Sequence, residues 1–320
     1  MISPERRTRT LIIAHRGASG YLPEHTLEAK ALAYAQGADY LEQDVVATRD
    51  DRLVVLHDIH LDRVTNVAEV FPRRHRADGR YYVRDFDLDE LRRLAVWERF
   101  TDAGSDLAVF SGRFPARWGC FRIAALDDEL QLVAGLNRST GRQVGIYPEI
   151  KSPEWHHAEG VDSARLLLET LSRYGYETAA DAAFIQCFHA AELVRLRQEF
   201  DCRLRLVQLL GENDRGESST DYDELRSDAG LARLAQTVQG IGPALNQLYT
   251  LAPIDDEPVS TGLVARAHAA GLAVHPYTFR ADALGPGFAS FADMVHWFAD
   301  TLRIDGLFTD FPDLARAALA

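Results

Sequence analysis

The chain has 320 residues, 47% of them hydrophobic, which is enough to bury one large core. A formal net charge of −13 argues against nucleic-acid binding, which usually needs a basic surface. Every apolar run is shorter than the roughly 18 residues of a membrane span, so no membrane span is expected. The three cysteines are an odd number and match no zinc-binding spacing, so neither a disulfide framework nor a zinc site is predicted.

Short apolar strands alternate with amphipathic helices along the chain, a pattern typical of a parallel α/β fold. Strands are predicted at 11–15, 39–45, 144–150, 183–188, 203–209, 241–245, 273–278 and 306–310. Helices are predicted between most of them, at 26–36, 163–174, 190–200, 262–270 and 291–302. Eight strands followed by helices is the count of a closed (β/α)8 TIM-type barrel.

One further strand, residues 53–57, does not fit this alternation. Only a few residues separate it from the strand before it, whereas a parallel crossover needs about a dozen. The two strands should therefore form an antiparallel hairpin. Reflection about Asp50 and Asp51 places His57 opposite Asp44, which would bring a histidine beside an acidic strand.

Residues 58–124 interrupt the barrel pattern. The stretch is rich in Arg, Asp and Tyr and contains several Gly and Pro residues, and it is too long for a simple loop. We expect a small, partly helical insertion subdomain over one face of a single barrel domain that spans residues 1–320.

His15, Arg16 and Gly17 follow an apolar strand directly. In a barrel the carboxyl-terminal strand ends carry the active site, and a histidine there can act as an acid or a base near neutral pH. Arg16 can grip phosphate oxygens with two donors, and Gly17 lets the backbone turn closely around a ligand.

Glu42 and Asp44 lie two residues apart on one strand, so their side chains share a face. Carboxylates facing apolar helices would be costly, whereas carboxylates at the barrel mouth can bind a cation. Glu149 and Lys151 repeat this spacing and offer a third carboxylate and a phosphate-binding cation. The alternatives are solvated acids on an edge strand, and a Glu149–Lys151 pair that satisfies itself. Oxygen ligands favour Ca²⁺ or Mg²⁺ over Zn²⁺.

These residues belong to a longer pattern. The run AHRGASGYLPEHTLEAKALAYAQGADYLEQDVVATRDDRLVVLHD closely resembles the start of glycerophosphodiester phosphodiesterases. The resemblance is strongest to the periplasmic bacterial branch and continues through LDRVTNV, FPRRHRADGRYYVRDF, YPEIKSP and GLFTDFPD. It covers nearly the whole chain.

The resemblance implies a barrel of the phospholipase C type that hydrolyses glycerophosphodiesters, small molecules such as glycerophosphocholine, to sn-glycerol 3-phosphate and an alcohol. It also implies a divalent cation, Ca²⁺ in preference to Mg²⁺. Matched position by position, it assigns acid/base catalysis to His15 and His57, metal binding to Glu42, Asp44 and Glu149, phosphate contacts to Arg16 and Lys151, and a supporting role to Glu24.

The walls of the substrate pocket are less well marked in the sequence. Phe188, Tyr277 and Phe279 stand at strand ends and are expected to line it, with Gln186 as a polar contact, although all four would also suit the core. His25 is expected to be structural. The start of the chain as given has no signal peptide, which predicts a cytoplasmic protein, or a periplasmic one if a leader has been removed. A monomer or a homodimer is expected.

Several alternatives stay open. The nucleophile is either water or the glycerol 2-hydroxyl, and the sequence does not decide which histidine is the base. A different phosphodiester is a rival substrate, for example a lysophospholipid whose acyl chain lies on Phe100, Phe110, Phe114 and Trp118 of the insertion. A barrel that binds a cation or a partner without catalysis is a rival of another class, and it would tolerate loss of either histidine.

Overall fold

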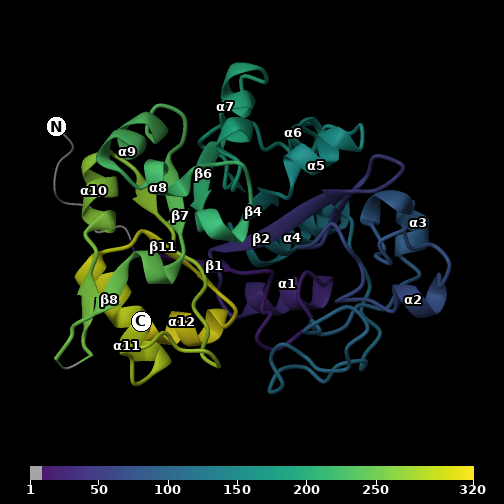
Figure 1. The fold of residues 1–320 in the computed structure, drawn as a ribbon, viewed down its shortest axis with the longest axis horizontal. Coiled ribbons are helices and arrows are strands. Elements are labelled where there is room, and N and C mark those ends of the chain that lie inside the picture. The colour runs from purple at the N-terminus through teal and green to yellow at the C-terminus, as the bar shows by residue number, and fades with distance from the viewer. Residues whose placement is uncertain (1–8, 255) are drawn as a thin grey trace.

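The computed structural model describes residues 9–254 and 256–320. Within them, eight parallel strands form a barrel in the order β10-β7-β6-β5-β4-β2-β1-β11 (Figure 1). Their bounds are Leu11–Ala14 (β1), Tyr40–Ala47 (β2), Gly145–Ile150 (β4), Phe184–Cys187 (β5), Arg205–Leu210 (β6), Gly240–Pro243 (β7), Ala273–Val274 (β10) and Gly306–Thr309 (β11). Each strand overlaps its predicted range, and the barrel prediction is confirmed.

The barrel closes between β10 and β11 through single hydrogen bonds instead of a regular ladder. The amide of Asp305 donates to the carbonyl of Val274 at 3.0 Å, and the amide of Phe308 donates to that of Pro276 at 3.0 Å. The amide of Phe279 donates in turn to the carbonyl of Phe308 at 2.8 Å. The first and last thirds of the chain meet through the parallel pairing of β1 with β11, which places the ends of these two strands side by side.

Helices surround the strands and bury their outer faces in the main apolar core. The longer ones are α1 (Leu27–Ala35), α4 (Leu126–Thr140), α6 (Ser163–Arg173), α7 (Ala190–Gln198), α9 (Asp228–Leu234), α10 (Leu263–Ala269) and α12 (Pro312–Ala318). Shorter pieces are α5 (Pro153–Ala158), α8 (Tyr222–Leu225), η2 (Asn213–Arg215) and η3 (Leu245–Gln247), and a hairpin pairs β8 (Tyr249–Leu251) with β9 (Pro258–Ser260). The helix predicted at 291–302 is divided into α11 (Phe291–His296) and a π-helical turn, η4 (Trp297–Leu302).

The predicted hairpin is present, with β3 (Leu53–Val55) antiparallel to β2. Its register pairs Val45 with Val55, and the amide of Leu56 donates to the carbonyl of Asp44 at 2.9 Å. The prediction that His57 lies opposite Asp44 is therefore wrong by one residue. The turn contains an odd number of residues, so it is centred on one residue and not between two.

Residues 58–124 contain only short helices, α2 (Val67–Val70), η1 (Val83–Asp85) and α3 (Leu88–Leu91), joined by irregular chain. They pack around a second apolar cluster, in which Phe86 and Leu91 are fully buried, and which Val46 and Val54 of the hairpin complete. In Figure 1 this stretch lies to the right, beside the hairpin and α1. It flanks the barrel mouth, where β1 and β2 end.

Among the described residues, no helix combines the length and the apolar character that crossing a membrane would require.

Gly17 shapes the turn that leads from β1 to α1. Its φ is +95°, and a Cβ atom there would lie 2.9 Å from the carbonyl carbon of Ala29. We expect Gly17→Ala to lower the free energy of unfolding by about 2–4 kcal/mol, through left-handed backbone strain and overpacking. Gly141 also has a positive φ, +73°, but no atom within 4 Å of such a Cβ. Gly141→Ala should cost only about 1 kcal/mol in urea unfolding, and equal losses would contradict the packing argument.

Candidate active site

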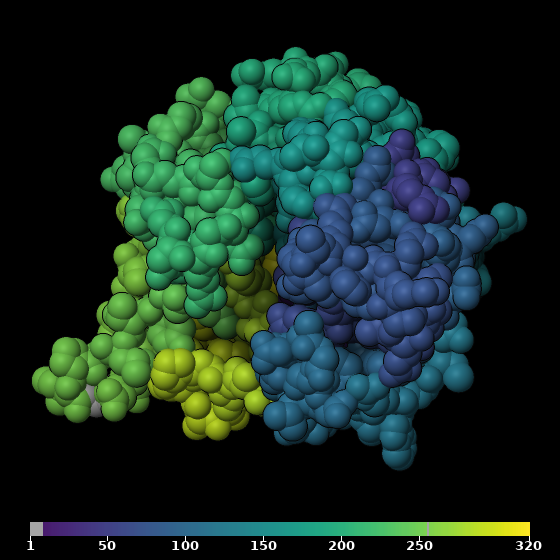
Figure 2. All heavy atoms as spheres, turned by 45° about the vertical axis from the view of Figure 1, so that its right-hand side comes forward, coloured from purple at the N-terminus to yellow at the C-terminus, as the bar shows by residue number. Residues whose placement is uncertain are grey.

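A cavity of about 450 Å³ opens at the carboxyl ends of the barrel strands. Figure 2 shows the molecule hollowed between the blue residues of the insertion and the green residues of the second half of the chain. The cavity is lined by most of the residues predicted from the sequence, namely His15, Arg16, Glu42, Asp44, His57, Glu149, Gln186, Phe188 and Tyr277. The fold thus gathers into one site side chains that lie far apart in the sequence, from His15 to Tyr277.

His15 is anchored by Asp310, which ends the neighbouring strand β11. The Nδ1 atom of His15 lies 2.5 Å from Oδ1 of Asp310, so the imidazole donates from Nδ1 to the carboxylate. Burial alone would raise the pKa of Asp310, but His15, Arg280 and Arg113 hold it well below its ordinary value. The Nε2 atom of His15 is left to face the cavity, 4.0 Å from Glu42.

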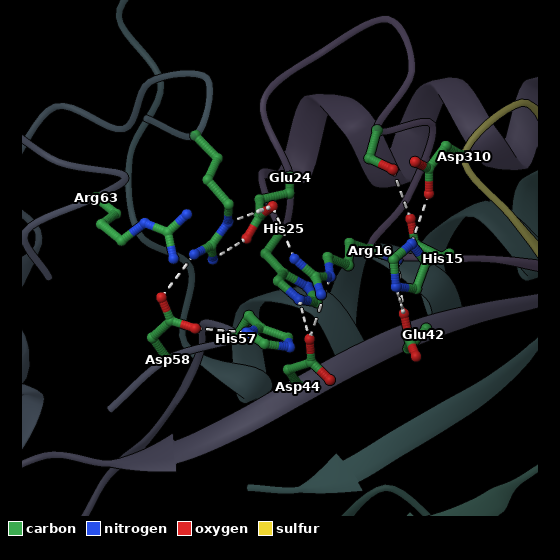
Figure 3. A network of polar contacts seen from close by, with 12 residues as sticks. His15, Arg16, Glu24, His25, Glu42, Asp44, His57, Asp58, Arg63 and Asp310 are labelled. Atoms are coloured by element: carbon green, nitrogen blue, oxygen red, sulfur yellow. Dashed lines mark hydrogen bonds and ion pairs between the residues drawn. The ribbon is translucent and has the colours of Figure 1, made fainter. Parts of the chain in front are cut away.

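His57 has the same kind of anchor. Its Nδ1 atom lies 2.5 Å from Oδ1 of Asp58, whose other oxygen accepts from Arg99 at 2.6 Å (Figure 3). Burial of the ring, together with the positive charges of Arg16 and Lys151, lowers the pKa of His57 to about 3. The side chain is therefore a neutral imidazole at pH 7, with a lone pair on Nε2, 3.3 Å from the Lys151 ammonium.

Glu42, Asp44 and Glu149 form a compact carboxylate cluster. One oxygen of each lies within 4.8 Å of the others, because β2 and β4 pair with Asp44 beside Glu149. All three side chains are buried. Burial is the main cause that raises the pKa of Glu149 well above its ordinary value; Lys151 opposes this shift, and the negative charge of Asp44 adds to it. Lys151 Nζ donates to Glu149 at 2.7 Å. Asp44 Oδ1 is buried with no hydrogen-bond partner in the described chain, which suits a bound cation.

Arg16 and Gln186 fix the neighbouring carboxylates. The main-chain amide of Arg16 and the side-chain amide of Gln186 each donate to Glu42 at 2.8 Å, to different oxygens. The guanidinium of Arg16 donates to Glu24 at 2.9 Å, and its Nε lies 3.7 Å from Asp44 without a hydrogen bond. Glu24 therefore orients Arg16 toward the cavity (Figure 3).

The aromatic residues predicted as pocket walls divide into two groups. Phe188 and Tyr277 line the cavity, with ring centroids 6.0 Å apart. Phe279 is fully buried and packs edge-on against Phe298 in the main core, so its predicted place in the pocket is wrong. The strand β10 ends at Val274, so Phe279 does not stand at a strand end as the sequence predicted.

The four rings that the sequence offered as an acyl-chain groove do not form one surface. They are Phe100, Phe110, Phe114 and Trp118. Phe100 is buried beside Trp97, and Trp118 is 67% exposed. The guanidinium of Arg113 covers the face of Phe110 at 3.7 Å from the ring centroid. The insertion therefore presents no continuous apolar surface made of these rings.

His25 has a larger part than the sequence indicated. Its Nε2 lies 2.7 Å from Oδ2 of Asp44, and its Nδ1 lies 3.4 Å from Nζ of Lys30. Lys30 also donates to Glu129 at 2.9 Å, and all three side chains are buried. Burial, together with Lys30, lowers the pKa of His25 to about 4, so the neutral ring donates to Asp44. This buried row holds Asp44 from behind.

The partners of the two histidines were also missed. Asp310 and Asp58 each follow an apolar strand directly, the same signal that marked His15. The pairing of Ala14 with Thr309 makes the next residues, His15 and Asp310, neighbours. That neighbourhood depends on which strands are adjacent in the barrel, and a single sequence does not contain this information in a local pattern.

Residues 15–314 match the sequence model of the Glycerophosphoryl diester phosphodiesterase family. The chain belongs to this family. Two relatives named glycerophosphodiester phosphodiesterase support the assignment. The one from Haemophilus influenzae is 43% identical over 98% of this chain and 90% of its own length. The one from Treponema pallidum is 37% identical over 95% of this chain and 90% of its own length.

Solved structures share the barrel fold of this phosphodiesterase family member. One from Silicibacter pomeroyi superimposes with a TM-score of 0.74 and 24% identity, over 98% of this chain and 94% of the other. An Oleispira antarctica phosphodiesterase, solved in complex with the product sn-glycerol-3-phosphate, gives a TM-score of 0.64 and 20% identity over 97% of both chains. At these identities the likeness establishes the fold alone.

The buried row behind Asp44 can be tested through stability. Lys30→Met leaves Glu129 buried without its cation, and we expect a loss of about 3 kcal/mol in the free energy of unfolding. Adding Glu129→Gln should recover part of that loss. Arg165→Met is the control, because its ion pair with Glu169 is 3.8 Å long and exposed, and it should change little. Equal effects of Lys30→Met and Arg165→Met in urea titrations would contradict the interpretation.

Proposed function

We propose that this protein hydrolyses glycerophosphodiesters to sn-glycerol 3-phosphate and an alcohol, with a bound divalent cation. One observation carries the proposal: His15 and His57, each anchored by an aspartate, line the same cavity as the carboxylates of Glu42, Asp44 and Glu149. Family membership supports it, as do the names of the two relatives and the product bound to the Oleispira enzyme.

The two histidines supply the proton transfers. Cleavage of a phosphodiester needs a base for the attacking oxygen and an acid for the departing one. Because His15 and His57 both donate from Nδ1 to an aspartate, each directs Nε2 at the substrate. One takes a proton from the nucleophile as the new P–O bond forms, and the other protonates the alcohol oxygen as its P–O bond breaks. The nucleophile is water, or the glycerol 2-hydroxyl in a first step whose cyclic phosphate water then opens.

The carboxylate cluster would hold the divalent cation, with Ca²⁺ preferred to Mg²⁺. A bound cation supplies positive charge to the phosphoryl oxygens. Oxygen ligands in a flexible arrangement suit Ca²⁺, whereas Mg²⁺ requires stricter octahedral geometry. The free oxygen of Asp44 and the raised pKa values of Glu42 and Glu149 support this use of the cluster.

Arg16 and Lys151 bind the phosphate in this proposal. Glu24 keeps the guanidinium of Arg16 in place, and the ammonium of Lys151 lies beside the reactive nitrogen of His57. Gln186, which is fully buried and still has a free Oε1, contacts the glycerol together with Phe188 and Tyr277. Residues 58–124 act as an insertion subdomain that walls one side of a single barrel domain.

The histidine roles predict a specific kinetic pattern. His15→Ala and His57→Ala should each lower kcat for glycerophosphocholine by about 10²–10⁴-fold, measured as glycerol 3-phosphate release. With glycerophospho-p-nitrophenol, whose leaving group needs no protonation, the variant that lacks the acid should regain most of its rate. His296→Ala, at an exposed histidine on α11, serves as the control. Full activity of both cavity variants would favour a barrel that binds without catalysis.

The cation can be tested by removal and by a matched substitution. Dialysis against a chelator should abolish turnover, and Ca²⁺ should restore more activity than Mg²⁺. Asp44→Asn should weaken Ca²⁺ binding by at least about tenfold in calorimetry. Asp162→Asn is the control, because Asp162 lies in another acidic cluster and Arg195 already neutralises it. Full turnover by protein shown to be metal-free would contradict the proposal.

A further inference from the structure

A second cavity, of about 300 Å³, adjoins the first on the side of the insertion. The two cavities share His15, Arg16, His57 and Arg280 as lining residues. The carboxylates of the cation cluster line the first cavity, whereas Glu98 and Arg63 of the insertion line the second. The two catalytic histidines therefore stand at the boundary between two differently lined spaces.

Charged side chains dominate the lining of the second cavity, and ion pairs join most of them. Arg99 binds Glu24 and Asp58 at 2.6 Å each. Arg113 and Arg280 both bind Asp310, at 2.7 and 2.8 Å. A space with such walls suits a small polar group and not an acyl chain.

The carboxylate of Glu98 lies among these ion pairs without one of its own in the described chain. The residue is 4% exposed, and its buried Oε2 has no hydrogen-bond partner in the part of the chain described. Leaving such an atom unpaired is costly, so a ligand that donates a hydrogen bond would be favoured there. Burial and, to a smaller extent, the negative charges of Glu24 and Asp310 raise the pKa of Glu98 to about 8, although the positive charge of Arg113 acts in the opposite direction. A positive group close to these three acids would be stabilised, and it would favour the ionised form of Glu98.

The chemistry of the reaction places the two halves of the substrate on different sides. Entering and leaving oxygens lie roughly in line through phosphorus. Hydroxyl oxygens are ligands for hard cations, so the glycerol half faces Glu42, Asp44 and Glu149 in the first cavity. With the phosphate between His15 and His57, the departing alcohol then faces the second cavity.

We propose that the second cavity binds the leaving alcohol of the substrate, and that Glu98 is a specificity residue which accepts hydrogen bonds from a primary ammonium on that alcohol. The proposal rests on the proposed function. An ethanolamine head group carries three N–H donors, whereas the quaternary ammonium of choline carries none. The class of substrate favoured is accordingly a glycerophosphodiester of a small amino alcohol.

The test compares two diesters with one variant. For Glu98→Gln, kcat/KM toward glycerophosphoethanolamine should fall about tenfold, the loss expected for a hydrogen bond between charged groups. Toward glycerophosphocholine it should change less than about threefold, because that head group makes no such bond. Free ethanolamine should inhibit the unaltered protein and inhibit Glu98→Gln more weakly. Glu98→Asp, which keeps the charge, should recover part of the ethanolamine preference, and Glu169→Gln, at an exposed glutamate, is the control.

Each outcome decides one of the two proposals. If Glu98→Gln loses activity equally toward both diesters, Glu98 has a structural role and the subsite proposal is overturned. If it loses none toward either, the subsite is overturned as well, while the phosphodiesterase function stands. If the unaltered protein releases glycerol 3-phosphate from neither diester, the proposed function fails and the subsite fails with it. Circular dichroism of each variant separates these results from unfolding.

Discussion

The need to compensate buried carboxylates governs this end of the barrel. Glu42, Asp44 and Glu149 lie together and are almost fully buried, and removing such charges from water costs several kcal/mol each unless partners offset the loss. Arg16, which lines the cavity, and the buried Lys151 supply cationic partners. The compensation is incomplete, because one oxygen of Asp44 is left free, and this residual demand is what a divalent cation can meet.

Behind the cluster, the compensation continues into the layer between the barrel and its helices. His25, Lys30 and Glu129 form a row in which the imidazole donates to Asp44 and the ammonium is shared between the ring and Glu129. A neutral histidine between a lysine and an aspartate adds no net charge, yet it determines that Oδ2 is the oxygen of Asp44 that accepts its hydrogen bond. The other oxygen, Oδ1, is left without a hydrogen-bond partner in the described chain.

A carboxylate anchor likewise orients each of the two cavity histidines, His15 and His57. Each donates its Nδ1 proton to an aspartate whose pKa is held low by that histidine and by neighbouring arginines, so Nε2 is the ring nitrogen not engaged by the aspartate. Arg99, Arg113 and Arg280 bind these anchors from the side of the second cavity. One arginine network thus supports the histidines and also forms a polar wall, in which the buried Oε2 atom of Glu98 is a carboxylate oxygen without a hydrogen-bond partner in the described chain.

The sequence by itself determined features that follow from local periodicity: the eight strands, the antiparallel hairpin, the shared face of Glu42 and Asp44, and histidines at strand ends. Its errors arose where local rules stop, at the register of His57, which depends on turn length, and at Phe279, which lies beyond the end of its strand. Only the tertiary structure decided that Asp310 anchors His15 and that Glu98 lines one cavity with His15 and His57. Those relations depend on which distant segments become neighbours, and barrel closure sets this through packing of the whole chain.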